Sequence, residues 1–430
     1  MLKKIFTFFL FLFLCFTSLS AQDFKKTGGL ARLGGIGYNP YVFDPFFNTV
    51  NPAWNAIYND FVIGDLGNLA SGLAPWGPGG GGQYFSGSFS VGNNWTIGGI
   101  LARNDFNGLS IALLDPGSNN AFGFPFPGVV STVNGLSDGS VVVPMDNNIE
   151  LITTYQTDHT SIGFGIAYAS TTRDFTPDSG ANAEGSANQL GLNLGVVHFA
   201  KNITLDLGFS VILPSASYKP AISGAGGNQA SADQTIFLVN GRGFLKLNQN
   251  LELVPVLVFA SVTGSLDSGF TSTTYSVDMI SFTSRSVGLG LNYHTGDFIL
   301  AGGVSFTWAT ITIPALNDVY PEYDLSANFF PVWNIGAEWH LLDWLVGRLG
   351  YFAVTGLATV EDPISVNAID EYVSTFFGPP RRGATVGVGF RFGDFSLDAM
   401  VNEDVLRQGF NVVGGGGPTF AYMTASYAIP

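Results

Sequence analysis

ITLDLGFSVIL, residues 203–213, places its side chains alternately on two faces. One face is apolar throughout and the other is mixed: Ile203, Leu205, Leu207, Phe209, Val211 and Leu213 against Thr204, Asp206, Gly208, Ser210 and Ile212. Only a β-strand puts successive residues on opposite sides. The same alternation recurs in residues 162–168, 287–293, 385–392 and 395–401. The chain is therefore predicted to be all-β.

The less apolar faces of these strands are small rather than charged. In residues 162–168 that face consists of Gly163, Gly165 and Ala167. A soluble β-sandwich would carry charged side chains there, whereas small inward side chains suit the lumen of a barrel. Very short turns join the strands in pairs, and long loops separate the pairs. This asymmetry is typical of outer-membrane barrels, whose short turns are periplasmic and whose long loops are extracellular.

Composition indicates a membrane environment. Charged residues make up 11% of the chain, whereas a typical soluble domain carries roughly 25%. Beyond residue 22 no apolar run reaches the length of about 18 residues that a membrane-spanning helix needs. Lipid admits only helices and closed barrels, because unpaired backbone groups are costly there. We therefore expect a transmembrane antiparallel β-barrel in the outer membrane of a Gram-negative cell.

The predicted barrel has 14–16 strands. Sixteen runs show strand alternation, and fourteen remain if the early glycine-rich runs are not strands. An even number returns both ends of the barrel to the periplasm. The runs are residues 60–69, 83–91 and 95–103, six hairpin pairs between residues 149 and 402, and residues 419–429.

The N-terminus has the pattern of a secretory signal. Lys3 and Lys4 precede an apolar stretch over residues 8–16, and small residues follow at 18–21. We expect a signal peptide over residues 1–21, an N-terminal segment over 22–57 and the barrel over 58–430. Removal of the signal takes away Cys15, the single cysteine. Disulfides, thiolate metal sites and a cysteine nucleophile are then excluded in the mature chain.

Charge and motifs exclude several classes of function. The net charge of −15 argues against nucleic acid or an anionic lipid surface as the main partner. The G-x-S-x-G, H-E-x-x-H and P-loop patterns are absent from the sequence. Three of the four histidines, His159, His294 and His340, lie in or beside separate short turns. We expect a monomer surrounded by outer-membrane lipid, with no catalytic activity, no cofactor and no metal.

Ionisable residues gather on the predicted lumen faces close to the short turns, and we name them the charge belt. One interpretation is that they pair with each other, bracing the barrel or holding a plug. The other is that Arg242, Arg348 or Arg391 binds the anionic head group of a substrate. The belt consists of Glu150, Asp206, Arg242, Lys246, Glu252, Glu338, Arg348, Arg391 and Asp398.

Further from the short turns the lumen faces become apolar. A water-filled porin would line this wall with charge. An apolar wall above a charged belt suits a hydrophobic ligand with one polar end, and it also suits a plug packed inside. The apolar positions are Ile236, Leu238, Val254, Val256 and Val258.

One long loop is rich in phenylalanine. Phe122, Phe124 and Phe126 lie in a predicted extracellular position, followed by Val129 and Val130. Exposed apolar clusters mark the capture of an apolar ligand or a partner. The alternative is a loop folded over the barrel mouth with its rings buried.

Residues 22–57 lack sustained alternation and carry glycines that allow close packing of the backbone. They also contain six rings, and each buried aromatic contributes on the order of 2 kcal/mol. The segment is therefore predicted to be an N-terminal plug inside the barrel. Its rings are Tyr38, Tyr41, Phe43, Phe46, Phe47 and Trp54.

The segment from residue 31 to 58, with its glycines and the motif Asn51-Pro52-Ala53, resembles the hatch of the FadL-like family of outer-membrane transporters for hydrophobic compounds. PorV-like barrels share this feature. Trp54 departs from the family pattern, as does the end of the chain, where Tyr427 is the nearest ring. The resemblance implies a barrel of about fourteen strands plugged by the hatch.

Passive uptake of hydrophobic or amphipathic compounds, such as long-chain fatty acids or hydrocarbons, is the function that the resemblance and the apolar wall favour. The alternative is a PorV-like docking barrel with secreted proteins as partners. A lipid-modifying barrel enzyme is a third hypothesis. Binding of a fatty acid or alkane would favour uptake, and co-purification of large secreted proteins would favour docking.

Overall fold

The computed structural model describes residues 26–67, 84–103, 110–111, 113–115, 127–136, 142, 145, 147–175, 183–219, 228–270, 273–315, 322–360, 382–401 and 420–430. The predicted signal peptide lies outside these residues. So do Phe122, Phe124 and Phe126 of the predicted capture loop. Their interpretations stay predictions.

Seventeen strand segments, all in one sheet, make up most of the described chain. Each segment has the alternating side chains of a strand. The bounds of β1, β2, β3 and β17 match the predicted runs within three residues. The segments are β1 (Phe61–Gly67), β2 (Tyr84–Val91), β3 (Trp95–Arg103), β4 (Asn147–Gln156), β5 (Thr160–Phe175), β6 (Ala183–Ala200), β7 (Ile203–Lys219), β8 (Asn228–Lys246), β9 (Leu251–Phe270), β10 (Thr273–Asp278), β11 (Ser281–Thr295), β12 (Phe298–Ile313), β13 (Tyr323–Leu342), β14 (Leu345–Val360), β15 (Arg382–Phe392), β16 (Phe395–Val401) and β17 (Phe420–Ala428).

The sheet closes on itself. Neighbouring strands pair antiparallel, and β1 pairs with β2 on one side and with β17 on the other. β10 and β11 pair with successive parts of β9 and are separated by Met279 and Ile280, so they share one position in the ring. Seventeen segments therefore fill sixteen positions in the described chain. The count of sixteen is confirmed, and the fourteen implied by the family resemblance is corrected.

The outer face of the ring is apolar. Leu207, whose side chain belongs to the apolar face of the quoted strand, is 38% exposed, and Leu349 on β14 is 63% exposed. Trp95 and Trp339 lie beside short turns and are half exposed, as expected of rings at a membrane interface. An apolar exterior on a closed antiparallel barrel is suited to lipid, and the chain is an outer-membrane barrel.

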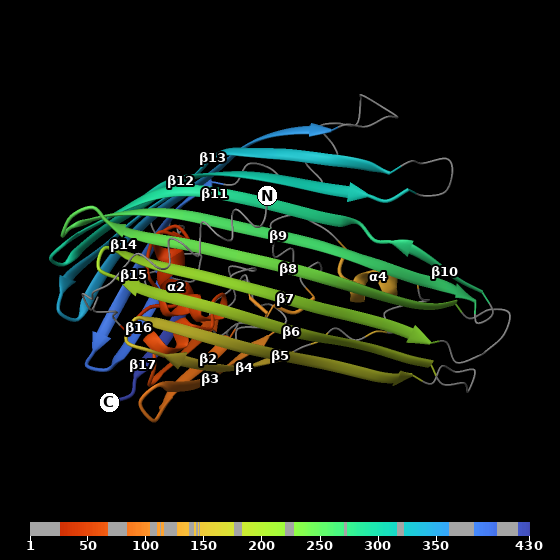
Figure 1. Cartoon of the computed structure of the whole chain (residues 1–430), viewed down its shortest axis with the longest axis horizontal. Coiled ribbons are helices and arrows are strands. Elements are labelled where there is room, and N and C mark those ends of the chain that lie inside the picture. Colours follow the sequence, from red (N-terminus) through yellow and green to blue (C-terminus); the bar gives the residue numbers. More distant parts are fainter. Residues whose placement is uncertain are drawn as a thin grey trace, which may run out of the picture.

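Short helices lie within the ring. They are α2 (Leu30–Gly35), the 3-10 helix η1 (Pro45–Thr49), α3 (Trp54–Ile57) and α4 (Val129–Leu136). α2 contacts β14 to β17 and α3 contacts β2 to β5, so the segment that carries them reaches across the lumen (Figure 1). Among the described residues, no helix is long and apolar enough to span a membrane.

α4 follows the predicted phenylalanine-rich loop. Its Val129 and Val130 are both buried, which fits the alternative of a loop folded over the barrel mouth. α4 packs against β7 and β8 (Figure 1). The Asp115 carboxylate accepts hydrogen bonds from the backbone N–H groups of Val129 and Val130, at 3.0 and 3.3 Å. These two bonds stabilise the start of the helix.

Candidate functional site

The candidate site lies where residues 26–58, hereafter the N-terminal segment, meet the inner wall of the barrel. Ala31, Asn39, Ala53 and Asn55 are completely or almost completely buried. The segment lacks the alternation of a strand, and its polar backbone must be satisfied by the wall. Charged side chains and glycines of the wall supply the two kinds of attachment.

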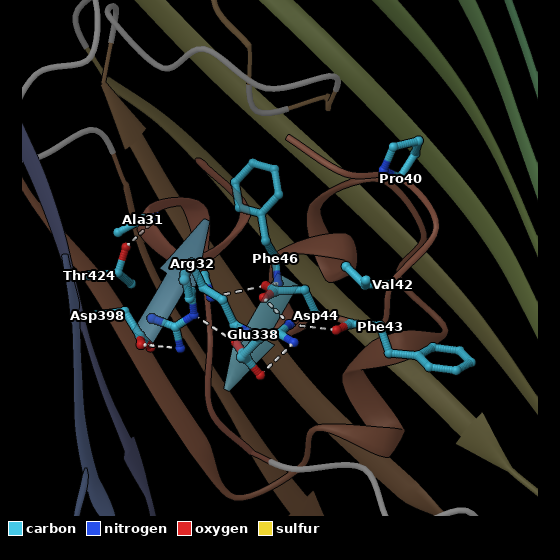
Figure 2. A network of polar contacts seen from close by, with 12 residues as sticks. Ala31, Arg32, Pro40, Val42, Phe43, Asp44, Phe46, Glu338, Asp398 and Thr424 are labelled. Atoms are coloured by element: carbon cyan, nitrogen blue, oxygen red, sulfur yellow. Dashed lines mark hydrogen bonds and ion pairs between the residues drawn. The ribbon is translucent and has the colours of Figure 1, made fainter. Parts of the chain in front are cut away.

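A chain of buried ion pairs links the segment to the wall (Figure 2). Arg32 of α2 donates from Nε to Glu338 Oε2 at 2.7 Å and from Nη1 to Asp44 Oδ2 at 2.9 Å. The same Nη1 donates to the carbonyl of Phe43 at 2.7 Å. Since Arg32, Asp44 and Glu338 are all less than 10% exposed, these bonds form in a medium of low dielectric constant, where removal of one partner is costly.

The ion pairs continue into the wall. Arg348 Nε lies 2.6 Å from Glu338 Oε2, and Arg348 Nη2 lies 2.8 Å from Asp398 Oδ1. Arg391 Nη2 lies 2.9 Å from the same Asp398 oxygen. Four members of the predicted charge belt therefore meet on β13 to β16. Arg32, which the sequence prediction did not include, connects them to the N-terminal segment.

Arg242 on β8 holds the segment from the other side. Its Nε donates to Asp206 Oδ2 at 2.8 Å, and its Nη1 donates to the carbonyls of Pro40 and Val42 at 3.2 and 3.1 Å. Its guanidinium also lies 3.6 Å from the centre of the Phe47 ring, a favourable cation–π contact. Arg242, Arg348 and Arg391 are each paired with a carboxylate, which favours the interpretation that the belt braces the barrel and holds the segment.

The predicted hatch motif lies over glycines of the wall. Asn51 Nδ2 donates to Asp206 Oδ1 at 2.6 Å, and Asn51 Oδ1 accepts from the N–H of Ala53 at 2.9 Å. Thr154 Oγ1 donates to the carbonyl of Pro52 at 2.9 Å. These hydrogen bonds satisfy polar groups of the motif inside the lumen and so fix the position of the motif.

Three glycines, directly opposite one another on β5, β6 and β7, form the floor beneath this motif: Gly163, Gly195 and Gly208. A Cβ atom at Gly195 would overlap the side-chain oxygen of Asn51, and one at Gly163 would overlap the backbone of Pro52 and Ala53. The wall therefore needs glycine here so that another backbone can approach. We name this row the glycine floor.

Asp44 is the titratable group at the centre of the segment. Burial raises its pKa to about 6, although the Arg32 charge and the N–H groups of Phe46 and Gly29 oppose the shift. Desolvation penalises the charged carboxylate more strongly than these partners stabilise it. The attachment of residues 42–44 is therefore sensitive to pH near neutrality.

A cavity of about 240 Å³ lies between the N-terminal segment and strands β7 to β9. Its lining is mainly apolar, with polar groups of the wall at Asp206, Asn240 and Arg242 and of the segment at Tyr38, Asn39 and Asn51. Val256 and Val258, predicted to form an apolar wall, line it as expected, whereas Ile236 and Leu238 pack into a separate buried cluster. From the segment, the lining includes Leu30, Leu33, Pro40, Phe46, Phe47, Val50 and Asn51.

A partition of rings separates this cavity from the end of the barrel that carries the short turns. The rings of Phe43 and Phe244 stack with their centres 3.8 Å apart. Phe244 and Val254 are nearly or completely buried and pack with Tyr41 and Phe43 in one cluster. Along β8 and β9, Phe244 and Val254 come directly after the cavity residues towards the short turn. We name this cluster the aromatic partition.

No protein-family model and no curated protein matches the chain. Among solved structures, it is similar to a Pseudomonas aeruginosa FadL homologue, with 13% identity, a TM-score of 0.44, and coverage of 93% of this chain and 98% of the other. The P. putida toluene transporter TodX has 11% identity, a TM-score of 0.38 and coverage of 94% and 98%. The Ralstonia pickettii toluene transporter TbuX has 11% identity, a TM-score of 0.36 and coverage of 93% and 96%.

The resemblance to FadL-like proteins noted in the sequence is thus seen again among solved structures. The fold itself rests on the strand pairing described above, and these similarities add no argument to it. Among the residues that the structure describes, no group of three or more His, Cys, Asp or Glu residues could hold a metal ion.

Proposed function

We propose that this barrel takes up hydrophobic or amphipathic compounds through its lumen. The observation that carries the proposal is the cavity between the N-terminal segment and β7 to β9. It is apolar over most of its lining, and its polar groups belong to Tyr38, Asn39, Asn51, Asp206, Asn240 and Arg242. Such an arrangement suits a ligand with a long apolar part and one polar end, because a few polar groups orient a ligand that apolar contacts retain.

Within this proposal, residues 22–57 act as a plug and residues 58–430 as the barrel. The buried ion pairs and the contacts over the glycine floor support this division, because both hold the segment across the lumen. Asn51, Pro52 and Ala53 serve as its fixed attachment. Transport then needs a local movement of the segment rather than its departure.

The proposal is tested by filling the cavity. Val258→Trp places a large ring into the cavity beside Asn240, so binding of a fatty acid to the purified protein in detergent should weaken by about a hundredfold or more. Leu289→Trp is the matched control, because Leu289 points outward from β11 and is 51% exposed. Titration by calorimetry measures both variants against the unchanged protein.

Equal affinity of the Val258→Trp and Leu289→Trp variants would show that the ligand does not occupy the cavity. Absence of binding by the unchanged protein to both fatty acids and alkanes would remove the proposed function. Co-purification of large secreted proteins in that case would favour the docking barrel instead.

A further inference from the structure

A polar vestibule lies at the mouth of the lumen on the side of the short turns. Its volume is about 620 Å³, and two ammonium groups line it, those of Lys201 and Lys246. Lys201 comes from the turn between β6 and β7, and Lys246 from the last position of β8. The N–H of Lys246 donates to the carbonyl of Asn202 at 2.8 Å, which brings the two turns together.

The vestibule also contains a carboxylate and an imidazole. Glu252 lies opposite Lys246 in the strand register and is 5% exposed. Its Oε2 lies 3.5 Å from Nε2 of His294 and makes no hydrogen bond. With one acidic and two lysine side chains, the vestibule is positive whether or not His294 is protonated. The chain as a whole carries 32 acidic against 17 basic residues, so the excess of positive charge in the vestibule is opposite in sign to the net charge of the chain.

The vestibule and the cavity lie on the same two strands. On β8, Arg242 lines the cavity, Phe244 belongs to the aromatic partition and Lys246 lines the vestibule. On β9 the order from the vestibule is Glu252, Val254 and Val256. Every second residue of a strand points inward, so these residues are consecutive inward positions. The aromatic partition is therefore a layer one side chain thick between the cavity and the vestibule.

We propose that a ligand leaves the cavity past Phe43 into this vestibule, and that Lys201 and Lys246 receive the carboxylate head group of an anionic amphiphile. This inference rests on the proposed function and narrows its substrate class to carboxylates. Arg32, Arg242 and Arg348 are engaged in ion pairs, whereas the two lysines face an accessible space. An ammonium group gives a charged hydrogen bond to a carboxylate.

Phe43 belongs to the N-terminal segment rather than to the wall, which makes it the movable half of the partition. Its carbonyl accepts from Arg32 at 2.7 Å, and the carbonyl of Val42 accepts from Arg242 at 3.1 Å. Both bonds hold the backbone, whereas the ring stacks on Phe244 and contacts the edge of Trp54. Rotation of the ring gives up these ring contacts and opens the partition without breaking the ion pairs.

The test compares a fatty acid with the alkane of the same chain length. Cells that lack their own fatty-acid barrel produce the full-length protein, and uptake of each labelled compound is measured. In the double variant Lys201→Gln/Lys246→Gln, fatty-acid uptake should fall about tenfold while alkane uptake is unchanged. Fatty-acid affinity of the purified protein should stay the same, because the cavity is intact.

Lys219→Gln is the matched control, since Lys219 is an exposed lysine at the opposite end of β7; it should leave both uptake rates unchanged. Phe43→Ala should raise uptake of both compounds several-fold in a barrel whose heat-modifiable migration is normal. Equal uptake of the fatty acid by the double variant and the unchanged protein would overturn the inference. So would a parallel loss for fatty acid and alkane. Failure of the unchanged protein to take up either compound would remove the proposed function together with the inference.

Discussion

The N-terminal segment is held in two different ways at two places, residues 42–44 and residues 51–53. Residues 42–44 are held by charged side chains. Arg32 donates to the carbonyl of Phe43 and to the Asp44 carboxylate, and Arg242 donates to the carbonyl of Val42. Residues 51–53 lie over the glycine floor, where close packing of the two backbones is supplemented by the hydrogen bonds of Asn51 to Asp206 and of Thr154 to Pro52. The first attachment is mainly electrostatic, and the second depends mainly on shape.

The difference separates a movable part from a fixed part. Charged groups can keep one partner while another is exchanged, and the ion pairs of Glu338 and Asp398 share oxygens between two cations each. Backbone packed against glycine has no alternative position of similar density. We therefore expect movement at residues 42–44, beside the aromatic partition, while residues 51–53 remain in place.

The largest effect is expected from breaking the ion pairs at their centre. Glu338→Gln leaves Arg32 and Arg348 buried without the carboxylate that they share. Loss of one partner from a buried pair costs roughly 3–5 kcal/mol, and here it should weaken docking of the N-terminal segment. Limited proteolysis of the folded protein in detergent measures the fraction of undocked segment.

Arg391→Gln provides the comparison, because Arg391 lies at the end of the chain of ion pairs and Asp398 keeps Arg348 as a partner. Its effect on proteolysis should be clearly smaller than that of Glu338→Gln. Equal protection in both variants would mean that the ion pairs do not hold the segment.

A smaller effect is expected at the glycine floor. Gly195→Val places a side chain where Asn51 and Pro52 now lie, and overpacking of this kind typically costs about 1–3 kcal/mol. Residues 51–53 should lift from the wall, so ion conductance in planar bilayers should rise. Gly241→Val is the matched control on β8, since a Cβ there meets no atom closer than the Leu207 side chain at 3.3 Å. Conductance that rises equally in both variants would contradict the role of the floor.

The smallest effect is a pH dependence of the charge-held part. Because burial raises the pKa of Asp44 to about 6, the docked segment binds a proton more tightly than the undocked one. Docking should therefore strengthen as the pH falls from 7 to 5, by about 1 kcal/mol. Proteolysis at pH 7 and at pH 5 measures the change. In Asp44→Asn the pH difference should disappear, and its persistence would assign the effect to another group.

The strands could be predicted from sequence because their residues alternate locally. The alternation in residues 203–213 is decided by the two faces of one strand, and β7 spans all of it. The break between β10 and β11 was not predicted, because it depends on how Met279 and Ile280 meet β9. α4 was missed for a similar reason, since three of its eight residues, Val129, Val130 and Val133, are buried where the helix packs against β7 and β8.

The candidate site was only partly predictable. Arg348, Arg391 and Asp398 were found because they interrupt apolar alternation close to short turns. Arg32 lies 306 positions before its partner Glu338, in a segment without periodicity, so no local pattern indicates it. Lys201 lies in the short turn between β6 and β7, and its place in the vestibule depends on the approach of a second turn, which no local pattern indicates. One signal was available for the glycine floor, since glycine recurs on inward faces of consecutive strands.

The central claim is that uptake needs movement at Phe43 but not at Asn48, where the N-terminal segment is hydrogen-bonded to Ser86 of β2. Two double-cysteine variants test it: Phe43→Cys/Phe244→Cys across the aromatic partition, and Asn48→Cys/Ser86→Cys, whose native side chains lie 3.3 Å apart. The one cysteine of the chain, Cys15, belongs to the predicted signal peptide. Each pair is bridged by a short, reducible thiol cross-linker, and fatty-acid uptake is measured before and after reduction. We predict that the bridge at residues 43 and 244 abolishes uptake until it is reduced, whereas the bridge at residues 48 and 86 leaves uptake unchanged. Normal uptake with the first bridge intact would contradict the account.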